Sequence, residues 1–361
     1  MESVALTLNR WSRFAADVRF ICDAGAEAPA EPERMLTMPA DLGKAAHEAA
    51  VVARLQAFRP DLIEYHQQLG CAAEIARRLP GVPQTLHRHT RIKPPSNPLD
   101  RWRYGRRLKV FDRLLFVSRA ARDEFLADYP GFDDRAEVVC NPIDVEAWRG
   151  DVGRKEKLIL FAGRAMADKG LDALCEALAA TLDQAPQWRA ALMLGDWERH
   201  RPWAQAHVDA LARFGDRVEI VCSASPDQVR AAARRAAVAV VPSRVAEALG
   251  LAALEAHAAG AALISSGRGG LREASGPHAV FVDPPEAPTL ATAMLALIGD
   301  DTLRLALARE GQAFVAHTHA PALRAAELDA LRLRLLAPEP VARAASFPRR
   351  TPHPLLTEAR P

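Results

Sequence analysis

Short apolar runs alternate with longer alanine-rich stretches along almost the whole chain. Uninterrupted runs of Val, Ile and Leu are typical of strands buried on both faces, and the longer stretches between them are typical of helices. This alternation predicts an α/β fold in which helices cover parallel sheets. The expected strands are 18–22, 62–66, 84–87 and 114–118 in the first half, and 158–162, 190–194, 218–221, 238–241, 262–264 and 280–282 in the second.

A break in this alternation separates the two halves. Asn141-Pro142 interrupts regular structure, and charged residues and glycines follow it before the next strand. We therefore expect two doubly wound, Rossmann-like domains, of residues 1–145 and 146–325, that face a cleft. A terminal helix at 326–338 and a proline- and arginine-rich tail at 339–361, expected to be disordered, follow the second domain.

The composition excludes several classes of protein. The chain has 361 residues, of which 49% are hydrophobic and 25% charged, and these values are typical of a globular protein of two domains. The formal net charge of +2 gives no overall case for nucleic acid binding. Five scattered cysteines suit a reducing compartment. No apolar run is long enough to span a bilayer and the start lacks a secretory signal, so we expect a cytoplasmic location.

Two glutamates flank the start of an expected helix in the segment 238–265, VAVVPSRVAEALGLAALEAHAAGAALIS. Glu247 precedes this helix and Glu255 lies inside it. Gly250 permits close approach of the backbone, so its NH group and that of Leu251 can bind an anion such as a diphosphate. A carboxylate about one turn further along suits the hydroxyls of a sugar or a ribose. The arrangement predicts a nucleotide-sugar site, although chance also places glutamates at this spacing on solvated helices.

The sequence around these glutamates resembles that of a known family. A buried strand, Pro-Ser, the pattern E-A-L-G-L-x-x-L-E-A-x-A-x-G and a further strand are similar to the retaining glycosyltransferases of family 4, which have the GT-B fold. The matching residues are Glu247, Gly250, Leu251, Glu255, Ala256, Ala259 and Gly260. Ala248 and Leu249 replace a proline and a phenylalanine that are frequent in the family. The resemblance implies that Glu247 contacts the donor sugar and Glu255 the ribose.

Further segments of the second half match the same family. The pattern G-R-x-x-x-x-K-G is present at Gly163, Arg164, Lys169 and Gly170. The resemblance implies that its two cations neutralise the departing diphosphate without a metal ion. It also implies that the turn at Gly195 lies beside the nucleotide, and that the loop starting near Cys222 contacts the base. UDP- and GDP-sugars are the expected donors, and no cofactor or metal is expected because no D-x-D motif is suitably placed.

Two histidines of the first half follow expected strands. His66 ends the strand 62–66 and His89 lies just beyond 84–87. Both match positions of the family, and the resemblance implies that His89 lies near the transferred sugar. Histidines at strand ends are otherwise often structural. We assign both to the acceptor side of the expected cleft, together with Arg88 and Arg91.

A locally basic segment begins at the same place. It contains Trp102 and Tyr104 among the cations Arg88, Arg91, Lys93, Arg101, Arg103, Arg106, Arg107 and Lys109. Cations attract anionic lipid and indoles prefer the membrane interface, so we interpret the segment as a binding site for a polyanionic or lipid-linked acceptor. RNA binding and an ordinary solvated helix face are the alternatives.

The beginning of the chain departs from the family pattern. The residues ESVALTLNRW, at 2–11, are typical of a helix, whereas a strand and a glycine-rich turn precede the first helix in the family. We therefore expect the first strand of the N-terminal domain to be missing. Either the start was assigned too late, or the chain lacks an element that borders the diphosphate.

These features favour a hexosyltransferase that moves a sugar from a nucleotide-sugar to a glycan or lipid-linked acceptor. Glu247, His89, Arg164 and Lys169 are the expected catalytic residues. Synthesis of surface polysaccharide or lipopolysaccharide, with peripheral contact at the inner face of the cell membrane, is the expected setting. The alternatives are a non-catalytic GT-B partner protein and a nucleotide-sugar epimerase. A dinucleotide oxidoreductase is disfavoured, because GRGG at 267–270 is too short and misplaced for the G-x-G-x-x-G motif.

Overall fold

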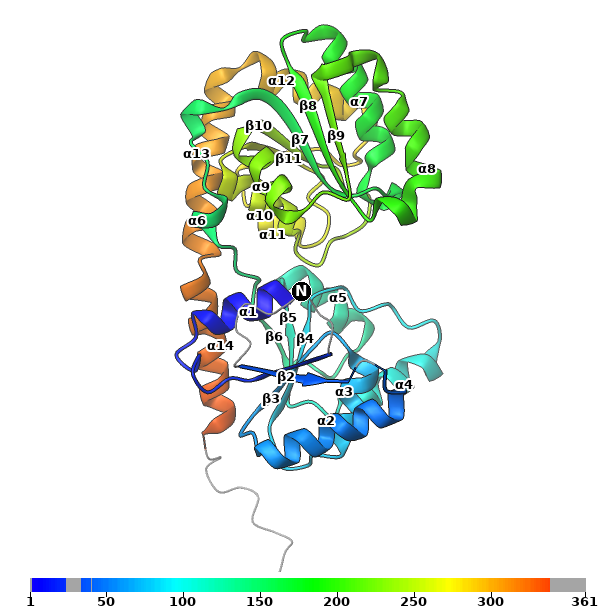
Figure 1. Ribbon diagram of the computed structural model, residues 1–361, viewed down its shortest axis with the longest axis vertical. Helices are drawn as coiled ribbons and strands as arrows, with labels where there is room; N and C mark the ends of the chain where they lie inside the picture. Colours follow the sequence, from blue (N-terminus) through cyan, green and yellow to red (C-terminus); the bar gives the residue numbers. More distant parts are fainter. Residues whose placement is uncertain (1, 24–33, 40, 338–361) are drawn as a thin grey trace, which may run out of the picture.

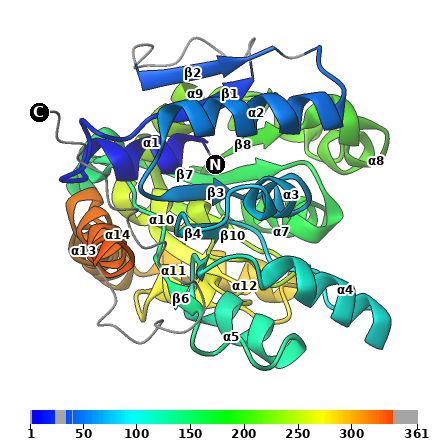
Figure 2. The ribbon, with the colours of Figure 1, turned by 90° about the horizontal axis from the view of Figure 1, so that it is seen from below.

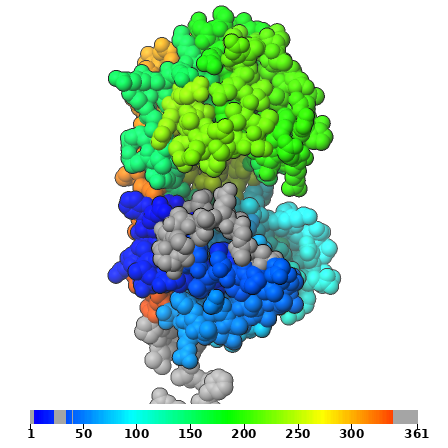
Figure 3. Space-filling view, in the orientation of Figure 1, coloured from blue at the N-terminus to red at the C-terminus, as the bar shows by residue number. Residues whose placement is uncertain are grey.

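The structure is a computed structural model that describes residues 2–23, 34–39 and 41–337, so the tail expected at 339–361 lies outside the described residues. Figure 1 shows two lobes, one above the other, and Figure 3 shows them as two bodies joined at a narrower waist. Helices α13 (Asp301–Thr318) and α14 (Pro321–Leu336) pass along one side of both lobes (Figure 1).

The lower lobe is built on a four-stranded parallel sheet of order β3-β4-β5-β6. Its strands are β3 (Ile63–His66), β4 (Gln84–Arg88), β5 (Arg113–Phe116) and β6 (Ala136–Val138). Its helices are α1 (Glu2–Arg10), α2 (Lys44–Phe58), α3 (Leu69–Arg77), α4 (Pro98–Leu108) and α5 (Arg119–Asp128). Figure 2 shows α2 and α5 on opposite sides of this lobe, with α4 projecting from its edge.

The upper lobe is built on a six-stranded parallel sheet of order β12-β11-β10-β7-β8-β9. Its strands are β7 (Glu156–Arg164), β8 (Arg189–Gly195), β9 (Val218–Cys222), β10 (Ala236–Val241), β11 (Ala262–Ser265) and β12 (Ala279–Phe281). Its helices are α6 (Val145–Trp148), α7 (Leu171–Gln184), α8 (Trp197–Asp209), α9 (Pro226–Arg235), α10 (Leu251–Ala259), α11 (Leu271–Ser275) and α12 (Ala287–Gly299). Short 3₁₀ turns are η2 (Val152–Arg154), η3 (Ala167–Lys169) and η4 (Ala212–Arg217).

The predicted α/β class with two Rossmann-like parallel sheets is confirmed, and each of the ten expected strands is present with shifted ends. The strand expected at 18–22 does not join the main sheet of the lower lobe. The strand found there, β1 (Phe20–Asp23), pairs instead with β2 (Met35–Met38) in a separate two-stranded parallel sheet. The short strands β2 and β6 were not predicted, because three or four residues of mixed character give no clear period.

Helix α14 returns from the upper lobe to pack against α1 in the lower one. Leu328 and Leu331 of α14 are buried with Val4 and Leu8 of α1. The same helix places Arg332 beneath the sheet, where this buried guanidinium pairs with Glu64 of β3 and Asp329 of α14. The Arg332 guanidinium also donates to Asn9 Oδ1, within α1, and to Ser12 Oγ, just after α1. The predicted helix at the start of the chain is therefore present and is joined to α14 by apolar and ionic contacts.

The segment between the lobes is attached to the turn that joins α13 and α14. The backbone NH of Ile143 donates to the carbonyl of His319 at 3.0 Å, and His319 Nδ1 lies 2.9 Å from the carbonyl oxygen of Asn141. Asn141 and His319 are both buried. The two chain crossings between the lobes are thus held side by side.

Candidate active site at the carboxyl ends of the upper sheet

Lys169 and Glu247 meet at the edge of the upper sheet where its parallel strands end. Lys169 is the last residue of η3, just after β7, and Glu247 lies in the loop between β10 and α10. Lys169 Nζ donates to Glu247 Oε1, and the hydroxyl of Ser243 donates to the same oxygen. Each of the two ionic side chains is 19% exposed. An α/β sheet binds ligands at this edge, so the predicted pair is placed where a ligand would be expected.

The glycines of the GRGG segment seat the loop that carries Glu247. The NH group of Glu247 donates to the carbonyl of Arg268 at 3.2 Å, and the NH group of Gly270 donates back to the carbonyl of Glu247 at 2.8 Å. A Cβ atom at Gly270 would lie 2.3 Å from the carbonyl oxygen of Ala248, and one at Gly269 would lie 2.6 Å from that of Glu247. Only glycine permits this close approach of two backbones.

Gly250 begins α10 in the way the sequence predicts. Its φ of 102° lies in the region that favours glycine, and a Cβ atom there would lie 2.4 Å from Leu271 Cδ2. No side chain caps the N-terminus of α10. Its first NH groups, which include that of the exposed Leu251, therefore remain for solvent or an anion.

The carboxyl ends of three neighbouring strands bring further predicted residues into a row. Arg164 ends β7 and pairs in register with Gly195, which ends β8. Cys222 ends the next strand, β9, and is exposed. Arg164 is also exposed, and its side chain forms no hydrogen bond or ion pair with the part of the chain that the structure describes. The exposed cation of Arg164 therefore lies at the end of β7, shortly before Lys169, whose ammonium is paired with Glu247.

Glu255, on α10, lines a mostly apolar pocket. Trp148, Ala162 and Val229 are among the residues that line the pocket with it. Burial raises the pKa of Glu255 to about 7, and the opposing attraction of Arg230 is too weak to prevent this. At neutral pH this carboxyl group is therefore poised between its neutral and ionised forms, which is unusual for a glutamate.

Three contacts close the lower lobe onto the Glu247 loop and its neighbours. Arg91 Nη1 donates to the carbonyl of Ala246 at 3.4 Å, and the hydroxyl of Ser118 donates to the carbonyl of Ala248. The carboxylate of Glu273, on α11, accepts from the first NH groups of α5 at 3.0 Å and 2.7 Å. A negative charge at a helix N-terminus is favourable, so this last contact joins the lobes electrostatically.

The acceptor-side residues of the lower lobe lie in two different environments. His66 Nδ1 and His89 Nε2 are 3.0 Å apart, so the structure brings the two predicted histidines together. Arg88 is buried and its Nη1 donates to the carbonyl of Gln67 at 2.6 Å, and burial lowers the pKa of this guanidinium. Arg91 is exposed and pairs with Glu124. Of the two arginines, only Arg91 reaches the other lobe.

Helix α4 exposes the basic face that the sequence predicts. The side chains of Leu99 and Trp102 are 54% and 56% exposed, and the guanidinium of Arg106 stacks over the Trp102 ring at 4.9 Å. The exposed cations of this region are Arg91, Lys93, Arg101, Arg103, Arg106, Arg107 and Lys109. Apolar and cationic groups therefore share one projecting helix. None of the helices in the described ranges is both long and apolar enough to cross a bilayer.

Comparison with known families identifies the chain. Residues 3–147 match the family described as Glycosyltransferase Family 4, and residues 156–300 match the one described as Glycosyl transferases group 1. The chain belongs to glycosyltransferase family 4. The two matched ranges correspond closely to the two lobes, so both halves of the fold carry the family's sequence pattern.

Individual relatives and solved structures are similar to this chain, and the structures share its fold. A D-inositol 3-phosphate glycosyltransferase of Catenulispora acidiphila is 31% identical over 55% of this chain and 52% of its own length. The chain spans about half the length of the first curated relatives it matches. A glycosyltransferase from Rickettsia africae superimposes with a TM-score of 0.77 at 14% identity, covering 93% of this chain and 94% of that one. The Anabaena HepE protein in complex with UDP-glucose superimposes with a TM-score of 0.74 at 18% identity, covering 92% and 95%.

Several residues of this family-4 site escaped prediction from the sequence. Ser243 follows Pro242 at the end of β10 and would be taken for an ordinary turn serine, yet it donates to Glu247. Glu273 is separated from α5 by more than 150 positions, so no local pattern could indicate their contact. The adjacent glycines at 269 and 270 indicate that another backbone segment approaches them closely. The sequence does not show that this segment is the Glu247 loop.

Proposed function

We propose that this protein is a retaining glycosyltransferase that uses a nucleotide-sugar donor. The observation that carries the proposal is the contact of Lys169 with Glu247 beside the uncapped N-terminus of α10. The contact places a cation, a carboxylate and free NH groups at one edge of the sheet. A diphosphate that carries a sugar requires this combination of groups.

Each group has a defined part in the proposed reaction. The NH groups at the start of α10 and the Lys169 ammonium stabilise the negative charge that develops on the diphosphate, and Arg164 moves in from its exposed position to join them. The bond between the anomeric carbon and the diphosphate oxygen breaks. The acceptor oxygen then bonds to the same face of the sugar, and its proton passes to the departing diphosphate. Glu247 orients the sugar hydroxyls, Glu255 the ribose, and His89 approaches from the lower lobe.

The proposed donor is a UDP- or GDP-sugar, bound without a metal ion or another cofactor. The Anabaena HepE protein, which has the same fold, binds UDP-glucose in its crystal structure. The position of Cys222 at the end of β9 supports contact with the base, and Gly195 at the end of β8 supports close passage of the nucleotide beside Arg164.

The proposed acceptor is a glycan or a lipid-linked glycan of surface polysaccharide or lipopolysaccharide synthesis. The exposed Leu99 and Trp102 on basic α4 support a peripheral contact with anionic lipid at the inner face of the membrane. Binding to phosphatidylglycerol vesicles, compared with phosphatidylcholine vesicles, tests this setting. Trp102→Ala with Arg106→Ala should weaken the binding to anionic vesicles, whereas Arg213→Met on the upper lobe should not.

The release of nucleotide from a panel of UDP-, GDP- and ADP-sugars, with glycan and lipid-linked acceptors, tests the proposed reaction. We expect Lys169→Met to lower kcat by about 10²–10³-fold, the usual cost of one group that stabilises a developing anion. Arg213→Met is a matched control, because this cation of η4 also pairs with a carboxylate, that of Asp183, but is 56% exposed. A folded Lys169→Met variant with unchanged turnover would contradict the assignment.

The same assay separates the alternatives. A non-catalytic partner protein would bind no donor and release no nucleotide with any acceptor. An epimerase would convert the donor sugar without an acceptor, so product analysis by chromatography would show a changed nucleotide-sugar. The exposed cation Arg164 beside Gly195 favours transfer, because it adds to the charge available for a leaving diphosphate.

A further inference from the structure

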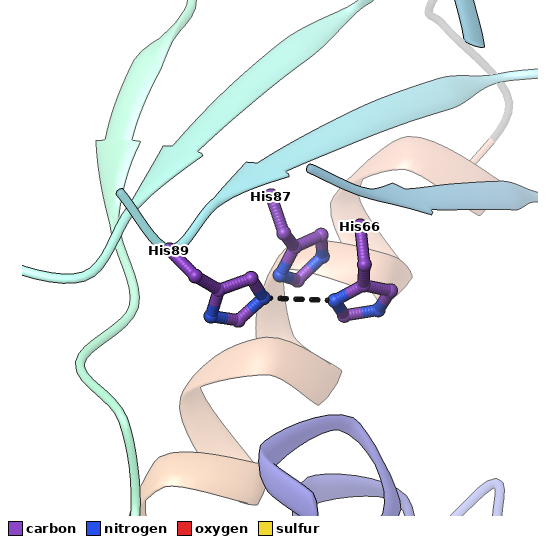
Figure 4. Close-up of side chains that lie close together, drawn as sticks. All are labelled: His66, His87 and His89. Carbon is purple, nitrogen blue, oxygen red and sulfur yellow. Dashed lines mark hydrogen bonds between the residues drawn. The ribbon is translucent and has the colours of Figure 1, made fainter. Parts of the chain in front are cut away.

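Three histidines form a cluster in the lower lobe, and the proposed transfer reaction gives a part to only one of them, His89. His66 is the last residue of β3, and its register partner on the neighbouring strand β4 is His87. His89 follows just after β4. Figure 4 shows the three rings side by side below the ends of these strands. His66 and His89 were candidates from the sequence, whereas His87 was not, because a histidine inside a buried strand gave no separate signal.

The ring nitrogens of the cluster converge. His66 Nδ1 and His89 Nε2 are 3.0 Å apart, and one nitrogen of each ring lies within 4.8 Å of the other two. The rings are close to parallel, with 28° between His66 and His87 and 17° between His66 and His89. In a tetrahedral zinc site with Zn–N bonds of about 2.0–2.1 Å, ligand nitrogens are about 3.3 Å apart. The hydrogen-bonded nitrogens of His66 and His89 lie near this separation, and a nitrogen of His87 lies within 4.8 Å of both.

Two nitrogens of the cluster lack partners. His87 Nε2 and His89 Nδ1 are buried, and neither has a hydrogen-bond partner among the described residues. Most buried polar atoms in proteins do have one. A buried imidazole nitrogen without a hydrogen-bond partner can act as a metal ligand.

The backbone around the cluster is fixed in place. Gln67, between His66 and α3, has a φ of 74°, which is uncommon for a residue other than glycine. Its side-chain oxygen accepts from the NH group of His89 at 3.0 Å, and its own NH group donates to the carbonyl of His87 at 2.9 Å. One strained residue thus joins the two strand ends that carry the histidines. Such strain is concentrated at functional sites.

The charges around the cluster are balanced. The Glu64 carboxylate lies 3.9 Å from His87 Nε2, and Arg332 holds this carboxylate from the other side. A carboxylate behind a histidine orients the ring and increases its basicity in many metal sites.

We propose that His66, His87 and His89 bind one divalent transition-metal ion of the Zn²⁺ type. Imidazole nitrogens suit zinc, nickel and copper, whereas Mg²⁺ and Ca²⁺ require oxygen ligands. Glu64 acts as the carboxylate behind His87, and the remaining coordination position is open to water. The proposal departs from the sequence-based expectation that the protein binds no metal. All three ligands belong to the lower lobe, so the proposed metal site is separate from the groups of the upper lobe that are proposed to bind the diphosphate.

Metal titration of the full chain without any nucleotide-sugar tests the proposal. The bound metal is measured after equilibrium dialysis against Zn²⁺ or Mg²⁺. We expect one Zn²⁺ more per wild-type chain than per chain of the His66→Gln or His89→Gln variant, and no saturable binding of Mg²⁺. His317→Gln serves as the matched control, because this histidine is exposed on α13 and should leave the count unchanged. Equal Zn²⁺ counts for the wild type and both cluster variants would overturn the proposal.

The absorption spectrum of bound Co²⁺ provides a second readout that does not depend on the folding of a variant. Tetrahedral Co²⁺ with nitrogen ligands absorbs strongly in the visible range, whereas Co²⁺ on surface carboxylates absorbs weakly. We expect the strong bands in wild-type protein at one equivalent of Co²⁺, with their loss on addition of one equivalent of Zn²⁺. A weak spectrum throughout the titration would overturn the proposal. Neither measurement involves turnover, so the result is independent of the proposed transfer activity.

Discussion

The raised pKa of Glu255 makes the stability of this protein depend on pH in a defined direction. The carboxyl group lies beside an apolar pocket, where burial raises its pKa from 4.5 to about 7. Between these values the folded chain retains a proton that the unfolded chain has released. The folded state therefore binds more protons, and the free energy of unfolding falls as the pH rises through this window. Replacement by glutamine removes the ionisation and retains the shape of the side chain.

The expected gain follows from the two pKa values. The difference between 4.5 and about 7 corresponds to a cost of about 3 kcal/mol for the ionised group above neutral pH. This is an upper value, because the side chain retains part of its exposure to solvent. Glu255→Gln should therefore increase the free energy of unfolding by less than about 1 kcal/mol at pH 5 and by up to about 3 kcal/mol at pH 8.

Urea unfolding followed by far-ultraviolet circular dichroism measures these gains. Wild type, Glu255→Gln and the control Glu176→Gln, whose side chain is exposed on α7, are compared at pH 5, 6, 7 and 8. The control should show no trend with pH. A gain for Glu255→Gln that is the same at pH 5 and pH 8 would refute the argument. In the proposed donor complex the ionised carboxylate accepts from the ribose, so wild-type donor affinity should also rise from pH 6 to pH 8, and that of Glu255→Gln should not.

Three further changes have outcomes that the contacts predict. Gly270→Ala should destabilise the fold by about 1–3 kcal/mol and weaken donor binding, because its Cβ would collide with the backbone of the Glu247 loop; thermal unfolding and donor titration measure both effects. Glu273→Gln should weaken the contact with Ala120 at the start of α5, and small-angle scattering should then report a larger radius of gyration than for wild type. Arg332→Met should cost about 3–5 kcal/mol in urea unfolding, because it leaves the buried Glu64 carboxylate unpaired.

The sequence was sufficient to predict the two main parallel sheets. Runs such as the one that became β10 are apolar without interruption, and only a buried parallel strand accommodates them in so few residues. The position of Gly250 was also predictable, since a glycine just before a helix permits close approach, and a Cβ atom there would lie 2.4 Å from Leu271 Cδ2. Local patterns of this kind depend on neighbours in the chain, which the sequence displays directly.

Contacts between distant segments could not be predicted in this way. The partner of Glu273 lies in the other lobe, and the return of α14 to α1 depends on how the two lobes are arranged. The same limitation hid the three-histidine cluster. His66 and His87 are opposite each other only because β3 and β4 pair in one particular register, and a shift by one residue would turn one ring to the other face of the sheet.

The contact between Lys169 and Glu247 leads to a last prediction, about how donor and product compete for the same cation. A diphosphate that binds the Lys169 ammonium has to share it with the Glu247 carboxylate, which holds it in the present structure. When the whole donor binds, the Glu247 carboxylate also contacts the sugar. This contact offsets the loss of affinity that results when Glu247 and the diphosphate compete for Lys169. A nucleoside diphosphate alone has no sugar, so it meets only the competing charge.

Glu247→Gln should therefore bind the free nucleoside diphosphate of the matching donor at least as tightly as wild type, while transfer from that donor is lost. The control Ser243→Ala removes only the hydroxyl that supports Glu247 and should change both quantities little. Isothermal titration calorimetry with the nucleoside diphosphate, combined with the nucleotide-release assay, separates the two effects. Weaker binding of the nucleoside diphosphate by a folded Glu247→Gln variant would mean that the carboxylate supports the phosphates rather than the sugar. Lys169 and Glu247 would then both act on the diphosphate, and the assignment of Glu247 to the sugar would be wrong.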